Sequence, residues 1–152
     1  EGFKTAMRVL DRGRLHLSAL AVGIAKRLID ESVRYASERE QFGQPIANFQ
    51  LVQAMLADSQ AEYFAAKCMV EESARRLDIS EKIIMDASCW KLYDTEMVGR
   101  VADRAVQIHG GAGYMAEYPV EHFYRDVRLL RLYEGTSQIQ QIVIAKEMLK
   151  RI

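Results

Sequence analysis

The 152-residue chain has the composition of one globular domain, with 49% hydrophobic and 28% charged residues. Lys and Arg number 21, as do Asp and Glu, so the formal net charge is zero. This balance argues against a nucleic-acid-binding protein, which needs a basic excess or a basic stripe. The longest uncharged apolar run, Ala19–Ala25, is far too short to predict a membrane span.

The cysteine and histidine residues do not form a metal-binding pattern. Cys68 and Cys89 are accompanied by no CxxC, CxxH or HExxH motif, and the three histidines show no ligand spacing. We therefore expect no metal site and no disulfide framework. Two free thiols in a reducing compartment are the better interpretation.

Breaker residues are scarce, which favours long helices. The chain has two prolines and nine glycines, and four of the glycines fall between Gly110 and Gly135. Apolar residues at helical spacing predict a first long helix over Leu15–Glu38. Gly43 and Pro45 then separate it from a second helix.

The second helix carries large side chains at seven-residue spacing, with small or medium residues at companion positions. Such a seam lets a partner helix lie close along its whole length. The large residues are Phe49, Leu56, Tyr63, Val70 and Leu77, and the companions are Val52, Ser59, Ala66 and Ser73.

Two further long helices complete the predicted fold. Apolar residues from Ile83 to Ile108, with Trp90 among them, predict the third helix. The last helix follows Thr136, its expected N-cap, and has Ile139 and Leu149 on its apolar side. Short connections between four helices predict an all-α, up-down-up-down four-helix bundle in which no strand is needed.

The glycine-rich segment after the third helix has two interpretations. Gly111, Gly113 and Ala116 fit a GxGxxA pattern, but a dinucleotide-binding fold requires a strand before the first glycine, and here a helix is predicted. The segment is then either a helix C-cap followed by a loop, or a turn whose bare backbone approaches a ligand closely.

Glu134 is the clearest candidate for chemistry. It lies just before the predicted last helix, where a carboxylate ordinarily stabilises the helix dipole from the surface. Its neighbours Leu132 and Tyr133 also fit a general base in an apolar cleft. These residues alone leave both interpretations open.

Four segments together resemble the acyl-CoA dehydrogenase family. They are LDRGRLHLSALAVG (Leu10–Gly23), REQFGQPIANFQ (Arg39–Gln50), QIHGGAGYMAEYPVEHFYRD (Gln107–Asp126) and LYEGTSQIQ (Leu132–Gln140), in the family's order and spacing. The resemblance implies that residues 1–152 are a single C-terminal helical-bundle domain. We expect an excised domain, inactive by itself, of a longer enzyme whose N-terminal helical and middle β domains are absent.

The resemblance also implies an activity. It is the FAD-dependent α,β-dehydrogenation of an acyl-CoA thioester to a trans-2-enoyl-CoA. Glu134 matches the catalytic base, which removes the α-proton while hydride passes from the β-carbon to flavin N5. The family further implies a homotetramer or dimer, electron-transfer flavoprotein as the acceptor, and residence in the bacterial cytoplasm or the mitochondrial matrix rather than secretion.

Other residues match family positions that bind the cofactor or the substrate. FAD contacts are implied for Arg39, Gln41, Phe42, Gln50, Gln107, Gly110, Gly111, Thr136 and Gln138. Contacts to the acyl-CoA are implied for Asp11, Arg14 and Gly135. In this family each FAD also reaches the bundle of a neighbouring subunit, where Gln107–Gly111 matches the adenosine-side contact.

Two residues disfavour particular subtypes of the family, and two alternative functions stay open. Gly13 stands near the position from which isovaleryl-type and long-chain-type members supply their base, which disfavours those subtypes. Glu134 stands where nitroalkane oxidases of the superfamily have aspartate, which disfavours them as well. An acyl-CoA oxidase-like flavoenzyme that uses oxygen remains an alternative, as does a non-catalytic bundle that only mediates oligomerisation.

Overall fold

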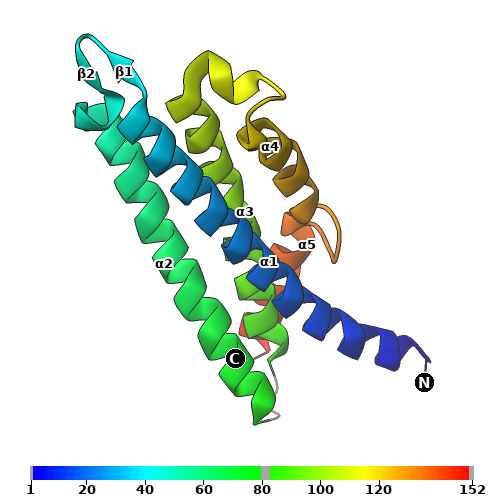
Figure 1. Cartoon of the computed structure of the whole chain (residues 1–152). Helices are drawn as coiled ribbons and strands as arrows, with labels where there is room; N and C mark the ends of the chain where they lie inside the picture. The colour runs from blue at the N-terminus through cyan, green and yellow to red at the C-terminus, as the bar shows by residue number, and fades with distance from the viewer. Residues whose placement is uncertain (1, 80–82, 151–152) are drawn as a thin grey trace.

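The computed structural model describes residues 2–79 and 83–150, with the side chains of 3–8 and 11 left aside. Five α-helices make up most of these residues (Figure 1). Their bounds are Gly2–Glu38 (α1), Gln50–Asp78 (α2), Ile84–His109 (α3), Pro119–Leu130 (α4) and Ser137–Leu149 (α5). Short 3₁₀ turns, Ile46–Asn48 (η1) and Gly110–Tyr114 (η2), precede α2 and follow α3. The predicted all-α class is confirmed.

Helices α1 to α4 alternate in direction and form the up-down-up-down bundle (Figure 1). The sequence predicts the terminal helix as the fourth member, whereas in the structure α4 packs against both α1 and α3. Pro119 starts α4 with its fixed φ. Val120, Val127 and Leu130 are its buried residues. This segment is rich in charged residues, so its narrow stripe of apolar residues was not recognised in the sequence.

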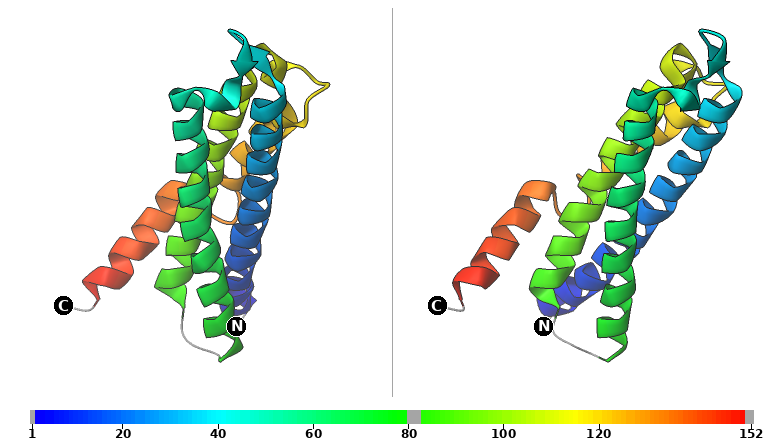
Figure 2. Two further views of the ribbon diagram at one scale, coloured as in Figure 1. Left: turned by 60° about the vertical axis from the view of Figure 1, so that its left-hand side comes forward. Right: turned by 90° about the vertical axis from the view of Figure 1, so that its left-hand side faces the viewer.

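The terminal helix α5 packs on α3 and diverges from the rest of the bundle (Figure 2). Its buried residues are Ser137 and Gln140, whereas Ile139 and Leu149 on the expected apolar side are exposed. These two apolar side chains are therefore uncovered in the part of the chain that the structure describes. No helix among the described residues is long and apolar enough to cross a membrane.

The first helix begins at Gly2 rather than at Leu15. No proline interrupts the earlier residues, and one internal glycine costs a helix only about 1 kcal/mol. The extension reaches beyond the bundle at the N-terminus (Figure 1). It also carries Gly13 and Arg14 along α1 to the level of the loop between α4 and α5.

A short hairpin joins α1 to α2, so the expectation that the chain needs no strand is wrong in this detail. Glu40–Gln41 (β1) pairs antiparallel with Gln44–Pro45 (β2). The two turn residues, Phe42 and Gly43, both have positive φ, at 53° and 78°. Positive φ at both central residues is the geometry of a type I′ hairpin turn.

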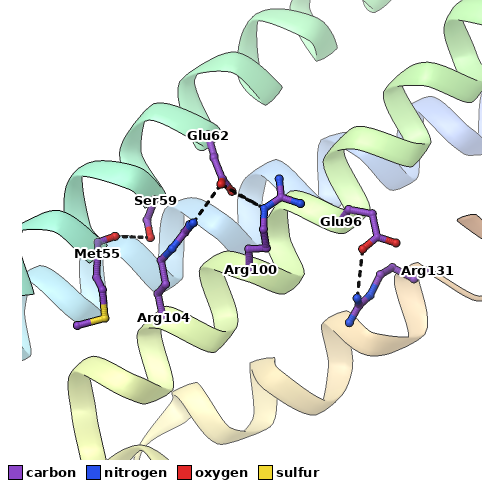
Figure 3. A network of polar contacts seen from close by, with 7 residues as sticks. All are labelled: Met55, Ser59, Glu62, Glu96, Arg100, Arg104 and Arg131. Atoms are coloured by element: carbon purple, nitrogen blue, oxygen red, sulfur yellow. Dashed lines mark hydrogen bonds and ion pairs between the residues drawn. The ribbon is translucent and has the colours of Figure 1, made fainter. Parts of the chain in front are cut away.

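The core follows the predicted helix faces. Trp90 forms a buried cluster with Ile83 and Ala87, and the small residues Ser59, Ala66 and Ser73 are the buried positions of α2, as the large-and-small seam predicts. Helix α3 lies centrally and contacts all four other helices. Ion pairs from Glu62 on α2 to Arg100 and Arg104 on α3 tie two of the long helices together (Figure 3).

Candidate functional site

Glu134 lies in the loop between α4 and α5 in a strained backbone conformation. Its φ is 56°, and that of Gly135 is 90°, so two successive residues are left-handed. A non-glycine residue adopts this conformation only where the surroundings enforce it. At Gly135 a Cβ atom would come within 2.6 Å of Gln140 Nε2, so glycine is needed there for space as well as for conformation.

Two buried side chains hold the carbonyl groups of this turn. Lys91 on α3 donates from Nζ to the Gly135 carbonyl oxygen over 2.7 Å. Gln140 on α5 donates from Nε2 to the carbonyl oxygens of Glu134 and Gly135, over 3.1 and 3.0 Å. Both side chains are fully buried. The backbone that carries Glu134 is therefore fixed from two different helices.

Glu96 on α3 fastens the two ends of the same loop. It accepts from Ser137 Oγ at 2.6 Å and from Arg131 Nη1 at 3.2 Å (Figure 3 shows the latter contact). The Ser137 amide also donates to the Arg131 carbonyl oxygen over 3.3 Å, which closes the loop. Burial opposes ionisation of Glu96, but the Ser137 hydrogen bond and the Arg131 charge outweigh it and lower its pKa.

The Glu134 carboxylate faces bare backbone on α1. A Cβ atom at Gly13 would lie 2.8 Å from Oε2, which shows that the carboxylate occupies the space beside that glycine. Oε2 is buried and accepts no hydrogen bond from any described residue. Burying an oxygen whose lone pairs accept no hydrogen bond costs free energy. Such an atom in a folded protein is therefore a candidate for a functional role. This arrangement suits a carboxylate that accepts a proton from a bound molecule.

Charged groups lie close to this carboxylate. Burial lowers the pKa of Lys91 to about 8, the carboxylates of Glu96 and Glu134 oppose that shift, and Arg14 adds to it. Arg14 is buried rather than displayed at the surface, so its predicted contact with acyl-CoA requires approach from the side of the Glu134 loop. The side chain of Asp11 lies outside the described part of the chain. Both substrate contacts stay predictions.

The second candidate site, after the Glu134 loop, is a hollow of about 520 Å³ where the hairpin meets η2, called the second hollow below. Arg39, Gln41, Gly110 and Gly111 all line it, although the two motifs that contain them are far apart in the sequence. A Cβ atom at Gly110 or Gly111 would meet open space. The bare backbone there is accessible to a ligand, while Gly110 also caps α3. The two interpretations of the glycine-rich segment are thus compatible.

An aromatic group forms the wall of this second hollow. Tyr35 stacks on His109 with 4.2 Å between ring centroids, and Tyr118 meets both edge-on. Burial lowers the pKa of His109, and its Nδ1 lies 2.8 Å from the Ala105 carbonyl oxygen. A neutral ring is therefore favoured at this position.

The remaining predicted FAD residues fall into two groups. Phe42 is 93% exposed at the tip of the adjoining hairpin, while Gln50 and Gln107 are exposed on the neighbouring helix ends. Thr136 and Gln138 lie instead at the N-terminus of α5, beside Glu134, where Thr136 caps the helix by accepting from the Ile139 amide over 3.4 Å. The structure thus gathers the predicted cofactor residues at two separate places.

Another hollow, of about 710 Å³, lies between α3 and α4. Arginines line it, but Arg100 and Arg104 are paired with Glu62 and Arg131 with Glu96, as Figure 3 shows. None of the predicted site residues reaches it. In the described residues no group of three or more metal-ligating side chains forms a candidate metal site.

Sequence reasoning missed the residues that support Glu134. Lys91 and Glu96 stand about forty residues before it and read as ordinary helix positions. A signal was nevertheless present, because both fall near the face of α3 that carries Trp90 and Met97, where charged residues are rarely buried without a partner.

Comparisons with known proteins identify the family of this chain. The family described as acyl-CoA dehydrogenase, C-terminal domain, matches residues 1–149. The chain therefore belongs to the acyl-CoA dehydrogenase family.

Individual relatives show how much of the protein this chain represents. It is 47% identical over 99% of its length to Probable acyl-CoA dehydrogenase YngJ of Bacillus subtilis, and 44% identical over 99% to the caffeyl-CoA reductase-Etf complex subunit CarC of Acetobacterium woodii. Butyryl-CoA dehydrogenase from Megasphaera elsdenii superposes with a TM-score of 0.95 at 38% identity, covering 97% of this chain and 39% of that one. The chain spans about 40% of the length of the curated relatives.

Proposed function

We propose that the full-length protein catalyses the FAD-dependent α,β-dehydrogenation of an acyl-CoA, with Glu134 as the catalytic base. The observation that carries this proposal is the Glu134 carboxylate itself. It is held on a strained, doubly clamped turn, its Oε2 atom is buried without a hydrogen bond from a described residue, and it faces the bare backbone of Gly13. A surface charge that merely stabilises a helix dipole would need none of these features.

The residues present fit FAD. Arg39 offers a planar set of donors suited to a pyrophosphate, and the open backbone at Gly110 and Gly111 allows an adenosine group to approach. At the other place, the N-terminus of α5 with Thr136 and Gln138 suits a ligand that carries acceptor atoms. When bound, FAD supplies the acceptor for the hydride that leaves the β-carbon.

This chain's own contribution is to take the α-proton. Removal of a proton from carbon requires a base within contact distance and little water around it. The turn fixes the Glu134 backbone, and the absence of a side chain at Gly13 leaves room beside the carboxylate. Oε2 then receives the proton and the carboxylate becomes a neutral acid. The electron pair of the broken C–H bond forms the new double bond as hydride departs from the β-carbon.

The opposite direction is a second candidate. The relative from Acetobacterium woodii is named as a caffeyl-CoA reductase subunit in a complex with Etf. In that direction Glu134 starts protonated and returns its proton to the α-carbon. We further propose an electron-transfer flavoprotein as redox partner in either direction, in place of the oxygen that an oxidase-like relative would use.

The test is an anaerobic titration of the full-length, FAD-loaded protein with a panel of acyl-CoAs. We expect flavin bleaching in the wild type and a rate about 10²- to 10⁴-fold lower in Glu134→Gln, the range for loss of a general base. FAD content should be unchanged. The control Glu117→Gln alters an exposed glutamate outside the loop and should bleach normally.

Each other outcome decides between the candidates. Full bleaching in Glu134→Gln would show that the base lies elsewhere. Oxidation of reduced flavin by an enoyl-CoA, without bleaching by acyl-CoAs, would favour the reductive direction. Rapid oxygen consumption would favour the oxidase. Bound flavin that responds to no acyl- or enoyl-CoA would contradict the substrate class.

A further inference from the structure

Lys91 is a buried cation that the proposed chemistry does not use directly. We propose that Lys91 is a positioning residue for Glu134, which holds the turn that carries the base and keeps a positive charge near its carboxylate. This inference rests on the proposed function, because a base needs positioning only if it reacts. Lys91 itself is not placed in contact with the substrate or the cofactor.

The buried position of Lys91 indicates that this side chain has a specific role. Its side chain is fully buried on α3, among residues such as Ala87 and Met97 that are also fully buried. A buried ammonium group is costly, and a methionine of similar length would pack there without that cost. Lys91 Nζ donates to the Gly135 carbonyl oxygen, 44 positions further along the chain. The cost of burial is thus compensated at the turn beside the base.

The contact acts on the part of the backbone that is strained. Glu134 and Gly135 are both left-handed, and a flexible loop would relax from this conformation. Lys91 approaches the Gly135 carbonyl from α3, whereas Gln140 approaches it from α5. Helix α5 itself packs on α3, so Gln140 ties the turn to the core through α5, whereas Lys91 ties it directly to the central helix.

The charges around Lys91 come from three elements. Arg14 faces it from α1, Glu96 from α3 itself and Glu134 from the loop. Glu96 is already engaged by Arg131 and Ser137. Of the two carboxylates, Glu96 has the larger effect on Lys91 and Glu134 adds to it. The hydrogen bond to the Gly135 carbonyl oxygen is therefore the contact through which Lys91 acts on the turn.

The experiment compares Lys91→Met, Lys91→Arg and Met97→Leu in the full-length, FAD-loaded protein. Lys91→Met removes the donor and the charge at similar volume, and Lys91→Arg keeps both. Met97→Leu is the matched control, since it alters another fully buried α3 residue whose side chain has no hydrogen to donate to the turn. The readouts are the rate of anaerobic flavin bleaching from pH 5 to 9, and amide hydrogen exchange across residues 131–140.

We expect Lys91→Met to slow bleaching by about 10-fold or more at neutral pH, because the turn that carries the base is no longer held from α3. Exchange across the loop should accelerate, while the affinity for acyl-CoA and the FAD content stay near wild type. Lys91→Arg should recover most of the bleaching rate and slow the exchange again, and Met97→Leu should match wild type in both readouts.

Two kinds of failure are distinguishable. If the wild type bleaches and Lys91→Met bleaches at the same rate with unchanged exchange in the loop, the positioning role is overturned and the proposed function stands. An equal loss of rate at every pH, without faster exchange in the loop, also overturns it, because that result indicates general damage. If the wild type responds to no acyl-CoA, the proposed function fails, and this role fails with it.

Discussion

Backbone strain coincides with the candidate functional residues. Among the described residues, the non-glycine positions with positive φ are Phe42 and Glu134. Both belong to the motifs that sequence analysis associated with FAD and with proton transfer. Strained residues persist only where their surroundings enforce them, and they cluster at functional sites. Phe42 is almost completely exposed, and its positive φ is the one that the type I′ turn of the hairpin requires.

Asp94 gives a prediction for stability at the residue scale. It is fully buried on α3. Burial raises its pKa to about 7, and the Ser18 hydroxyl only partly opposes this rise. The native state therefore keeps a proton between about pH 4 and 7 that the unfolded chain releases. Stability should fall as the pH rises through this window.

Asp94→Asn removes this pH dependence. The amide cannot ionise, so the variant should be more stable than wild type at pH 8, by an amount on the order of a few kcal/mol, and close to wild type near pH 4. Urea unfolding of the 152-residue domain, followed by fluorescence of its single tryptophan, Trp90, measures both. Asp58→Asn, at an exposed position, serves as the control. A parallel pH dependence in wild type and Asp94→Asn would contradict the prediction.

At the scale of elements, α3 organises the site. It supplies Lys91 and Glu96 to the base loop, and its C-terminus leads into the glycine-rich segment of the second hollow. The short helix α5 is held mainly through this contact with α3. The orientation of α5, and with it the N-terminus that carries Thr136, therefore depends on a few polar contacts.

Glu96→Ala should loosen α5 without unfolding the bundle. The variant loses the hydrogen bond from Ser137 and the ion pair with Arg131. Loss of such partly buried polar contacts costs about 1–3 kcal/mol, so amide exchange in α5 should accelerate about 5- to 100-fold. The matched control is Glu62→Ala, which breaks the ion pairs between α2 and α3 shown in Figure 3 but leaves α5 untouched. Equal acceleration in both variants would refute a specific link.

The sequence predicted elements better than it predicted their assembly. The heptad seam of α2 and the apolar face of α3 follow from local periodicity, and both are confirmed. The place of α4 in the bundle was missed because its apolar stripe is narrow and its surface highly charged. The apolar side of α5 was correctly read as a helix face, yet Ile139, Ile142 and Leu149 on it are exposed in the described part of the chain.

The candidate site was predictable only in part, for a similar reason. Glu134 stands in a recognisable local motif, and its neighbours in sequence mark it. The contacts from Lys91 and Gln140 depend instead on the path of the chain in space. A pattern in the sequence shows which residue can react, whereas the residues that hold it appear only when distant helices are brought together.

At the scale of the whole molecule, the two groups of predicted cofactor residues are far apart. Gly13 lies beside Glu134, and Arg39 follows the C-terminal end of the same helix. Twenty-six residues of α helix at 1.5 Å each separate them by roughly 39 Å. An extended FAD is shorter than this. We therefore expect one bundle to serve two FAD molecules, one at Glu134 and another at Arg39, which requires the proposed homo-oligomer.

Mixed oligomers test this arrangement. When Glu134→Gln and Arg39→Ala subunits are co-expressed with different tags, a hybrid pair contains one doubly defective site and one intact site. The intact site takes Glu134 from one subunit and Arg39 from the other. Hybrids isolated through both tags should show about half the wild-type activity per pair, although each parent alone is nearly inactive, since a symmetric dimer exchanges residues reciprocally between its sites. If both residues serve the same FAD within one subunit, no hybrid site is intact, and activity stays at the level of the parents.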